Sequence, residues 1–131
     1  MKNFFSNYKI IFYLINTILI IFYLFPGSLL GWIIYGNLKT QPQITQDFLI
    51  SSNHFYVFFI ISVTGFLTFT KLNQIKKLIY YLLTLSIILE ILHIAIPQRS
   101  FEWLDLFGNL IGVVVVIFLK NLINKYGIIK K

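Results

Sequence analysis

The chain has 131 residues, the length of one domain. Hydrophobic residues make up 58% of it and charged residues only 11%, a balance too apolar for a small soluble domain. The net charge of +7 lies at the ends of apolar runs instead of in a basic patch studded with aromatic residues, which argues against nucleic acid as a partner. The lack of cysteine excludes disulfides, thiolate metal sites and a cysteine nucleophile.

The apolar runs are continuous instead of alternating, which predicts α-helices in a lipid bilayer. We therefore expect an all-α, polytopic membrane protein with a single domain over residues 1–131. Its four transmembrane helices should form an antiparallel bundle. The helices are predicted at about 10–25, 48–69, 78–96 and 103–119, with outer loops at 26–47 and 97–102.

The first predicted helix follows two lysines, an arrangement that also describes a signal peptide. No small-x-small cleavage pattern follows it, and the run ends in Pro-Gly-Ser at 26–28, so we expect a retained helix. In the next loop, LLGWII at 29–34 is too short to span a bilayer. Two interpretations of this patch are open: an interfacial lid over the bundle, with Trp32 beside the headgroups, or an irregular extension of the first helix.

The three later helices carry ionisable and amide side chains at membrane depth. A charge near the middle of a membrane helix costs about 2.5–3.5 kcal/mol on insertion scales, so such residues usually pair inside a bundle and have a function there. The third predicted helix contains Glu90 and His93 and ends before Pro97, a helix breaker. The other members are His54 in the second helix and Asp105 and Asn109 in the fourth.

The distribution of basic residues predicts the orientation. Of the 11 lysines and arginines, only Lys39 and Arg99 lie in the two predicted outer loops. The positive-inside rule therefore places both termini in the cytoplasm, with the protein in the cell membrane. All four acids and both histidines then fall in the outward-facing half.

Depth along the helices brings these polar residues together. Glu90, His54 and Asn109 each lie six or seven residues inside the expected outer end of their helix. At a rise of about 1.5 Å per residue, all three reach one layer roughly 9–10 Å below the outer boundary. A shallower layer holds His93 and Asp105, with Arg99 at the rim.

Helical faces agree with this grouping. Glu90 and His93 are spaced i, i+3 on one face, and Asp105 and Asn109 are spaced i, i+4 on another. In the fourth helix, Gly108 and Gly112 form a small-xxx-small pair, which lets a neighbouring helix approach closely.

Several chemistries are open to this cluster. The E-x-x-H spacing from Glu90 can supply two metal ligands, and His54 and Asp105 could complete such a site. A di-metal bundle, however, needs more carboxylates than this chain places inside. We therefore predict neither a resident metal nor a cofactor. Glu90 and His54 could instead act as an acid/base pair. Arg99 suits a phosphate or carboxylate at the headgroup level. A packing role alone is the plainest alternative, because such hydrogen bonds contribute about 0.6–1.7 kcal/mol each.

Two motifs resemble those of the VanZ-like membrane proteins over roughly residues 47–119. E-x-x-H-x-x-x-P-x-R begins at Glu90 and D-x-x-x-N-x-x-G begins at Asp105, while His54-Phe55 is similar to a His-Phe of that family's second helix. His93 stands where the family usually has glutamine, and Ile50-Ser51 replaces its usual Asp-Lys. The matching residues are His54, Glu90, Arg99, Asp105 and Asn109.

The resemblance implies an envelope protein that affects susceptibility to the glycopeptide teicoplanin, with no established reaction. Our hypothesis is an outward-facing pocket that binds or modifies an anionic envelope molecule, such as a lipid-linked cell-wall precursor, among membrane lipids. The candidate acid/base or hydrogen-bonding residues are His54, Glu90 and Asp105, and the candidate ligand-binding residues are Arg99, Asn109 and His93. The alternatives are a small proton-coupled exporter acting as a homo-oligomer, and a scaffold without a site.

Overall fold

The computed structural model describes residues 2–127, with side chains from residue 8 onward, and within this range it contains helices and no strand. The prediction of an all-α chain is therefore confirmed. The helices are α1 (Lys2–Leu24), α2 (Leu29–Tyr35), α3 (Ser52–Thr68), α4 (Leu72–Leu92) and α5 (Trp103–Tyr126).

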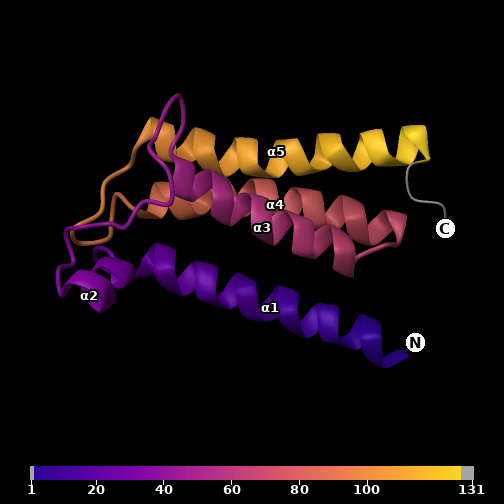
Figure 1. Ribbon diagram of the computed structural model, residues 1–131, viewed down its shortest axis with the longest axis horizontal. Helices are drawn as coiled ribbons and strands as arrows, with labels where there is room; N and C mark the ends of the chain where they lie inside the picture. The colour runs from indigo at the N-terminus through magenta and orange to yellow at the C-terminus, as the bar shows by residue number, and fades with distance from the viewer. Residues whose placement is uncertain (1, 128–131) are drawn as a thin grey trace.

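The four long helices run along the long axis of the molecule, and successive ones run in opposite directions (Figure 1). Helix α3 packs against α1, α4 and α5, most extensively against α5. Helix α2, the loop to α3 and the turn from α4 to α5 all lie at one end of the bundle, which we call the loop end (Figure 1). The start of α1, the turn from α3 to α4 and the last turn of α5 lie at the opposite end.

Two glycines of α5 explain its close contact with α3. A Cβ atom on Gly108 would lie 2.7 Å from the carbonyl oxygen of Ser51, and one on Gly112 would lie 2.7 Å from that of Phe55. Only glycine lets the two backbones come this near, so the close approach predicted from the small-xxx-small pair is confirmed. Next to this contact, the apolar core contains Phe58, Ile61, Leu82 and Val113, all fully buried.

Fewer helices than predicted have the length and composition of a membrane span. Among the described residues, α5 meets both criteria by itself. A second span meets them only if two helices bent by 84° are counted together, Tyr8–Leu24 and Leu29–Tyr35. Helix α3 is apolar but short, with 17 residues. Helix α4 is not among these spans, and it carries two lysines and a glutamate. One helix, or two with the bent pair, is thus apolar and long enough to cross, and a four-span bundle is not shown.

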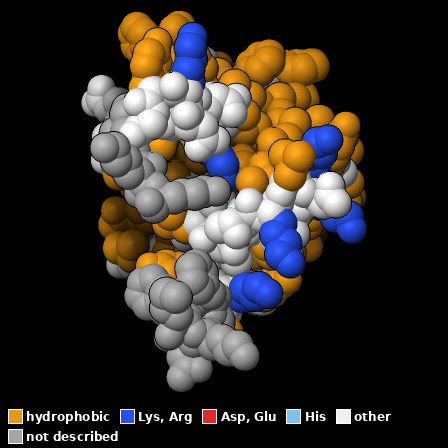
Figure 2. All heavy atoms as spheres, turned by 90° about the vertical axis from the view of Figure 1, so that its right-hand side faces the viewer, with side chains coloured by type: hydrophobic (Ala, Val, Ile, Leu, Met, Phe, Trp, Pro, Cys, Tyr) orange, Lys and Arg blue, Asp and Glu red, His pale blue; other side chains and the backbone are white. Residues whose placement is uncertain are grey.

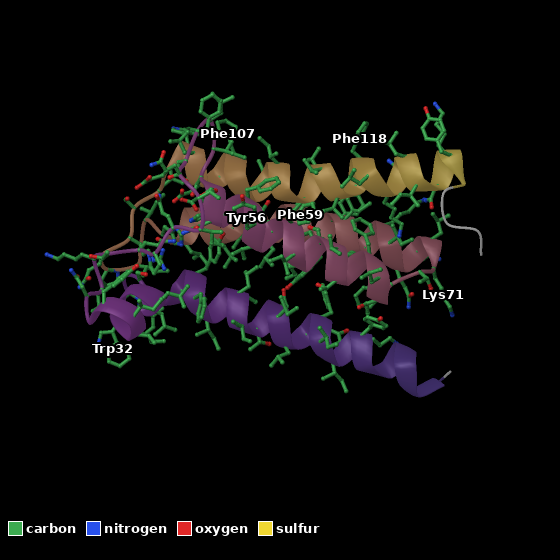
Figure 3. The ribbon with its side chains drawn as sticks, in the orientation of Figure 1. Trp32, Tyr56, Phe59, Lys71, Phe107 and Phe118 are labelled. Atoms are coloured by element: carbon green, nitrogen blue, oxygen red, sulfur yellow. The ribbon has the colours of Figure 1, made fainter. Side chains whose placement is uncertain are left out.

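The surface of the bundle is strongly apolar. Phe107 and Phe118 point outward from α5, and Trp32 points outward from α2 at the loop end (Figure 3). Viewed from the opposite end, hydrophobic side chains cover much of the surface, and Lys or Arg side chains are the only charged ones visible among the described residues (Figure 2). The described acids are Asp47, Glu90, Glu102 and Asp105, in or next to the loop end.

Helix α4 was predicted over residues 78–96, and both bounds are wrong. It begins at Leu72, because the polar residues after the turn continue as helix with their long side chains exposed. It ends at Leu92 instead of reaching Pro97, and residues 93–96 are linked by tighter i→i+3 hydrogen bonds. A proline disfavours the α conformation in the residue before it, so the chain tightens ahead of Pro97.

The other long helices also differ from their predicted bounds. Helix α1 begins at Lys2, not at residue 10. Helix α3 begins at Ser52, not at Phe48, because the carboxylate of Asp47 accepts a 2.7 Å hydrogen bond from the Ser52 amide at its first turn. Helix α5 continues seven residues beyond the predicted end at 119 and stops at Gly127, whose φ of 60° is typical of a glycine C-cap.

The apolar patch of the first loop forms a helix of its own, so the interpretation as an extension of α1 is wrong. Ser28 begins α2 by accepting a 2.9 Å hydrogen bond from the Gly31 amide. Gly36 ends it with a φ of 65°. Leu29 and Leu30 at the start of α2 line a cavity at the loop end, the place expected for a lid.

Candidate functional site

A cluster of buried polar side chains lies at the loop end, where four helices contribute to it. Glu90 and Asn109 are 0% exposed and His93 is 1% exposed, although the three sit among apolar helices. The structure brings His54, Glu90 and Asn109 together, as their depths predicted. The buried members are Tyr23 from α1, His54 from α3, Glu90 and His93 from the end of α4, and Asn109 from α5, and the partly exposed Asp105 of α5 lies at the edge of the cluster.

Asn109 is the centre of the hydrogen bonds in this cluster. Its Oδ1 accepts a 2.6 Å hydrogen bond from the hydroxyl of Tyr23 and lies 3.0 Å from Nδ1 of His54. Its Nδ2 donates to the carbonyl oxygen of Ser86 at 3.2 Å, which fixes the orientation of the amide. Asn109 therefore connects α5 with α1, α3 and α4.

His54 lies between the two acids of the cluster. Its Nε2 is 3.4 Å from Oδ2 of Asp105, and its Nδ1 is 3.9 Å from Oε2 of Glu90. Nδ1 also lies 3.0 Å from the Tyr23 hydroxyl. Contacts from both ring nitrogens fix the plane of the imidazole, so it can exchange a proton with a carboxylate without reorienting.

Glu90 has one satisfied oxygen and one unsatisfied oxygen. Oε1 accepts a 3.0 Å hydrogen bond from the backbone amide of Glu102 in the turn before α5. Oε2 accepts no hydrogen bond from the described residues, although it lies 3.3 Å from Nδ1 of His93. His93 is anchored on its other side, where Nε2 donates to the carbonyl oxygen of Tyr23 at 3.1 Å.

Arg99 has a structural contact that the sequence did not indicate. Its guanidinium donates from Nη2 to the carbonyl oxygen of Phe22 at 2.9 Å and from Nε to that of Phe25 at 3.3 Å. These are carbonyls at the end of α1 that no helical amide can reach, so Arg99 caps that helix. Partial burial lowers the pKa of Arg99 from its usual value, because it weakens the hydration of the charge.

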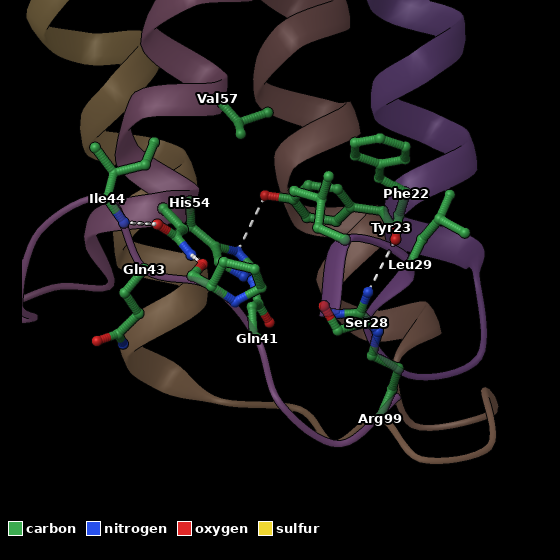
Figure 4. A pocket seen from close by; sticks show the side chains of 13 residues that line it. Phe22, Tyr23, Ser28, Leu29, Gln41, Gln43, Ile44, His54, Val57 and Arg99 are labelled. Carbon is green, nitrogen blue, oxygen red and sulfur yellow. Dashed lines mark hydrogen bonds between the residues drawn. The ribbon is translucent and has the colours of Figure 1, made fainter. Parts of the chain in front are cut away.

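Two cavities lie beside the cluster. The first, of about 200 Å³, has a mainly apolar surface, although polar side chains, among them His54 and Arg99, also form its wall (Figure 4). The second, of about 430 Å³, is mostly polar, and His93, Asp105 and Lys39 line it. Ser28, Gln41 and Arg99 border both cavities, which therefore adjoin at these residues.

Sequence reasoning missed two members of the site. Tyr23 is one of eight tyrosines and does not stand out among them, but it lies on one helical face with Phe12 and Leu19, both of which are buried. Lys39 served only to predict orientation, whereas it lines the polar cavity. Its position in a predicted outer loop, otherwise free of basic residues, was the available signal.

Comparisons with protein-family models, with curated proteins and with solved structures find no match to this chain. The resemblance to VanZ-like proteins thus stays a prediction that rests on the motif residues. Of these residues, His54, Glu90, Asp105 and Asn109 lie in one cluster, and Arg99 lies beside it at the wall of both cavities.

Proposed function

We propose that the chain is an integral membrane protein that binds, and acts upon, an amphiphilic anionic molecule of the cell envelope, such as a lipid-linked cell-wall precursor. The observation that carries the proposal is the junction of an apolar and a polar cavity at Ser28, Gln41 and Arg99. A molecule with a hydrocarbon chain and a polar head needs one compartment of each kind, side by side.

The polar cavity is lined by two basic side chains, Lys39 and Arg99, and by the carboxylates of Glu102 and Asp105, and the two basic side chains are the groups that would hold an anionic head. Lys39 and Arg99 are the basic residues of the loop end. Arg99 uses two of the five N–H donors of its guanidinium to cap α1, so the others remain for a ligand. An arginine fork and a lysine point charge together are a common phosphate-binding pair.

A four-span arrangement in the cell membrane, with cytoplasmic termini, is part of this proposal. The described lysines other than Lys39 lie toward the end opposite the cavities, as the positive-inside rule requires if that end is cytoplasmic. Helix α3, with 17 residues, has about the minimum length for a span. Exposed lysines at the start of α4 can reach the headgroups with their side chains, so α4 can cross as well.

In this arrangement the cavities open at the outer headgroup level, where lipid-linked precursors of the cell wall carry their phosphates. The resemblance to VanZ-like proteins points the same way, since an effect on teicoplanin susceptibility would follow from binding a precursor in the outer leaflet. His54 at the apolar cavity and Asp105 at the polar one place the buried cluster next to the junction, where it can act on the bound head.

Binding of a polyprenyl phosphate to the purified full-length protein in detergent micelles tests the proposal, with the uncharged polyprenol as the reference ligand and native mass spectrometry as the readout. We expect the phosphate to bind more tightly, and Lys39→Gln to weaken it by about tenfold, the loss of one charge-assisted contact. Lys71→Gln removes the same charge at the opposite end and should change nothing (Figure 3). Equal binding of polyprenol and its phosphate, or equal effects of the two variants, would contradict it.

A further inference from the structure

We infer that His54, Glu90 and Asp105 form a binding site for one divalent transition-metal ion, such as Zn²⁺ or Mn²⁺. One ligand atom from each of these side chains lies within 4.8 Å of the other two, and the residues come from α3, α4 and α5. The inference goes beyond the proposed lipid binding and stands without it, because it depends only on how the donor atoms face one another.

The first observation is the unsatisfied oxygen of Glu90. This side chain is 0% exposed, and its Oε2 accepts no hydrogen bond from the described residues. A buried carboxylate is costly unless a positive group or several donors face it. Arg99, the nearby permanent cation, directs two of its donors to the carbonyls of α1.

The histidine nearest to that oxygen can donate to it only if both of its ring nitrogens carry a proton. Nε2 of His93 lies 3.1 Å from the carbonyl oxygen of Tyr23, which only accepts, so this nitrogen carries the proton of the neutral ring. Nδ1 of a neutral His93 then has a lone pair, and it points at Oε2 of Glu90 across 3.3 Å. Two acceptors at this distance need a proton or a metal cation between or beside them.

The same reasoning applies to His54. The Tyr23 hydroxyl gives its proton to Oδ1 of Asn109, so Nδ1 of His54, 3.0 Å from both oxygens, must be the donor. In the neutral ring Nε2 then has a lone pair, 3.4 Å from Oδ2 of Asp105. A ligating histidine is normally held in this way, with its other nitrogen donating to a fixed oxygen.

A single divalent cation held by His54, Glu90 and Asp105 would neutralise the carboxylate that faces His93 and the one that faces His54. It brings two positive charges to two carboxylates, and it accepts the lone pair of a neutral imidazole. Ligand atoms about 2.0–2.2 Å from zinc lie about 3.3 Å apart. Nε2 of His54 and Oδ2 of Asp105, 3.4 Å apart, are already spaced for it, and Glu90 needs to move closer. One imidazole with two carboxylates suits Zn²⁺ or Mn²⁺.

Second contacts and access also fit such a site. The backbone amide of Glu102 holds Oε1 of Glu90, and Asn109 with Tyr23 holds His54, so two of the three ligands are oriented from behind. The polar cavity reaches Asp105 and leaves room for a further ligand from solvent or substrate. A single ion with three protein ligands also needs fewer carboxylates than a di-metal bundle does.

Metal uptake by the full-length protein in detergent micelles tests the inference. The protein is treated with a chelator, given Zn²⁺ or Mn²⁺ alone and desalted, and bound metal is counted by mass spectrometry. We expect about one ion per chain and at least about tenfold weaker binding in Asp105→Asn, whose side chain lies at the edge of the cluster. Asp47→Asn, the matched change in the exposed first loop, should bind as the unchanged protein does. No bound ion in the unchanged protein, or equal binding in Asp105→Asn, overturns the inference.

A second variant separates the cation from a pair of protonated histidines. In Glu90→Gln, the amide can donate to Nδ1 of a neutral His93. We expect this variant to have a higher Tm than the unchanged protein in chelator, and to lose the rise in Tm that metal gives the unchanged protein. If imidazolium rings occupy these positions instead, Glu90→Gln removes an ion pair and lowers Tm in chelator, and that result would overturn the inference even if the Asp105 variant misfolds.

Discussion

The hydroxyl of Tyr23 offers a direct test of the buried network, because Tyr23→Phe removes one oxygen and leaves the rest of the ring in place. That oxygen donates to Asn109 at 2.6 Å and contacts Nδ1 of His54 at 3.0 Å. The ring itself stacks on His93, with centroids 5.6 Å apart, and packs edge-on against Phe58. These ring contacts survive the substitution, so the change in stability reports the hydrogen bonds.

The expected loss follows from what remains. Nδ1 of His54 and Oδ1 of Asn109 still lie 3.0 Å apart, so neither group is left without a partner when the hydroxyl is removed. Side-chain hydrogen bonds between membrane helices contribute about 0.6–1.7 kcal/mol, and the hydroxyl makes two such contacts. We therefore expect Tyr23→Phe to lower the free energy of unfolding by about 1–2 kcal/mol.

Unfolding in mixed micelles with increasing denaturing detergent, followed by circular dichroism, measures this quantity. Tyr13→Phe is the matched control, since Tyr13 lies on the same helix, is 58% exposed and should cost less than about 0.5 kcal/mol. A double-mutant cycle with Asn109→Leu should give a coupling of at least about 0.5 kcal/mol. The network does not hold α1 in place if Tyr23→Phe and Tyr13→Phe are equally stable.

Two further substitutions test the packing around the site. Gly112→Val should destabilise the protein by more than about 2 kcal/mol, because the first added carbon would meet the carbonyl oxygen of Phe55 at 2.7 Å. An unchanged unfolding curve would mean that α5 does not lie this close to α3. Asp47→Ala should lower the free energy of unfolding by about 1 kcal/mol and speed hydrogen exchange at the Ser52 amide. Asp47→Asn keeps an acceptor and should have neither effect. Similar exchange in both variants would show that the carboxylate does not cap α3.

The layer of Glu90, His54 and Asn109 could be found from sequence because helix geometry is regular. Each helix end near the loops was marked by a proline, an acid or a tryptophan, and a constant rise then converts position into depth. An error of a few residues in a helix end moves its polar residue by only a turn. For this reason the cluster was located although α3, α4 and α5 all have bounds that differ from the predicted ones.

The contacts of Arg99 and Tyr23 could not be found in that way, because they depend on how α1 sits against the other helices. The end of α1 is nearly uniform in hydropathy, so periodicity does not show which face is buried. A residue at the rim such as Arg99 can face solvent, lipid or a neighbouring helix end. Only the tertiary arrangement selects the carbonyls of Phe22 and Phe25 as its partners.

The satisfied and unsatisfied parts of the cluster separate two roles that the sequence left open. A network that serves packing alone should pair its members, and Asn109 fits this description, with an acceptor and a donor both used. Glu90 does not, since one of its oxygens is buried and accepts no hydrogen bond from the described residues, although it lies 3.3 Å from Nδ1 of His93. Burying such a group without a donor costs stability. The unsatisfied oxygen of Glu90 is therefore the feature on which the metal uptake experiment with Asp105→Asn bears most directly.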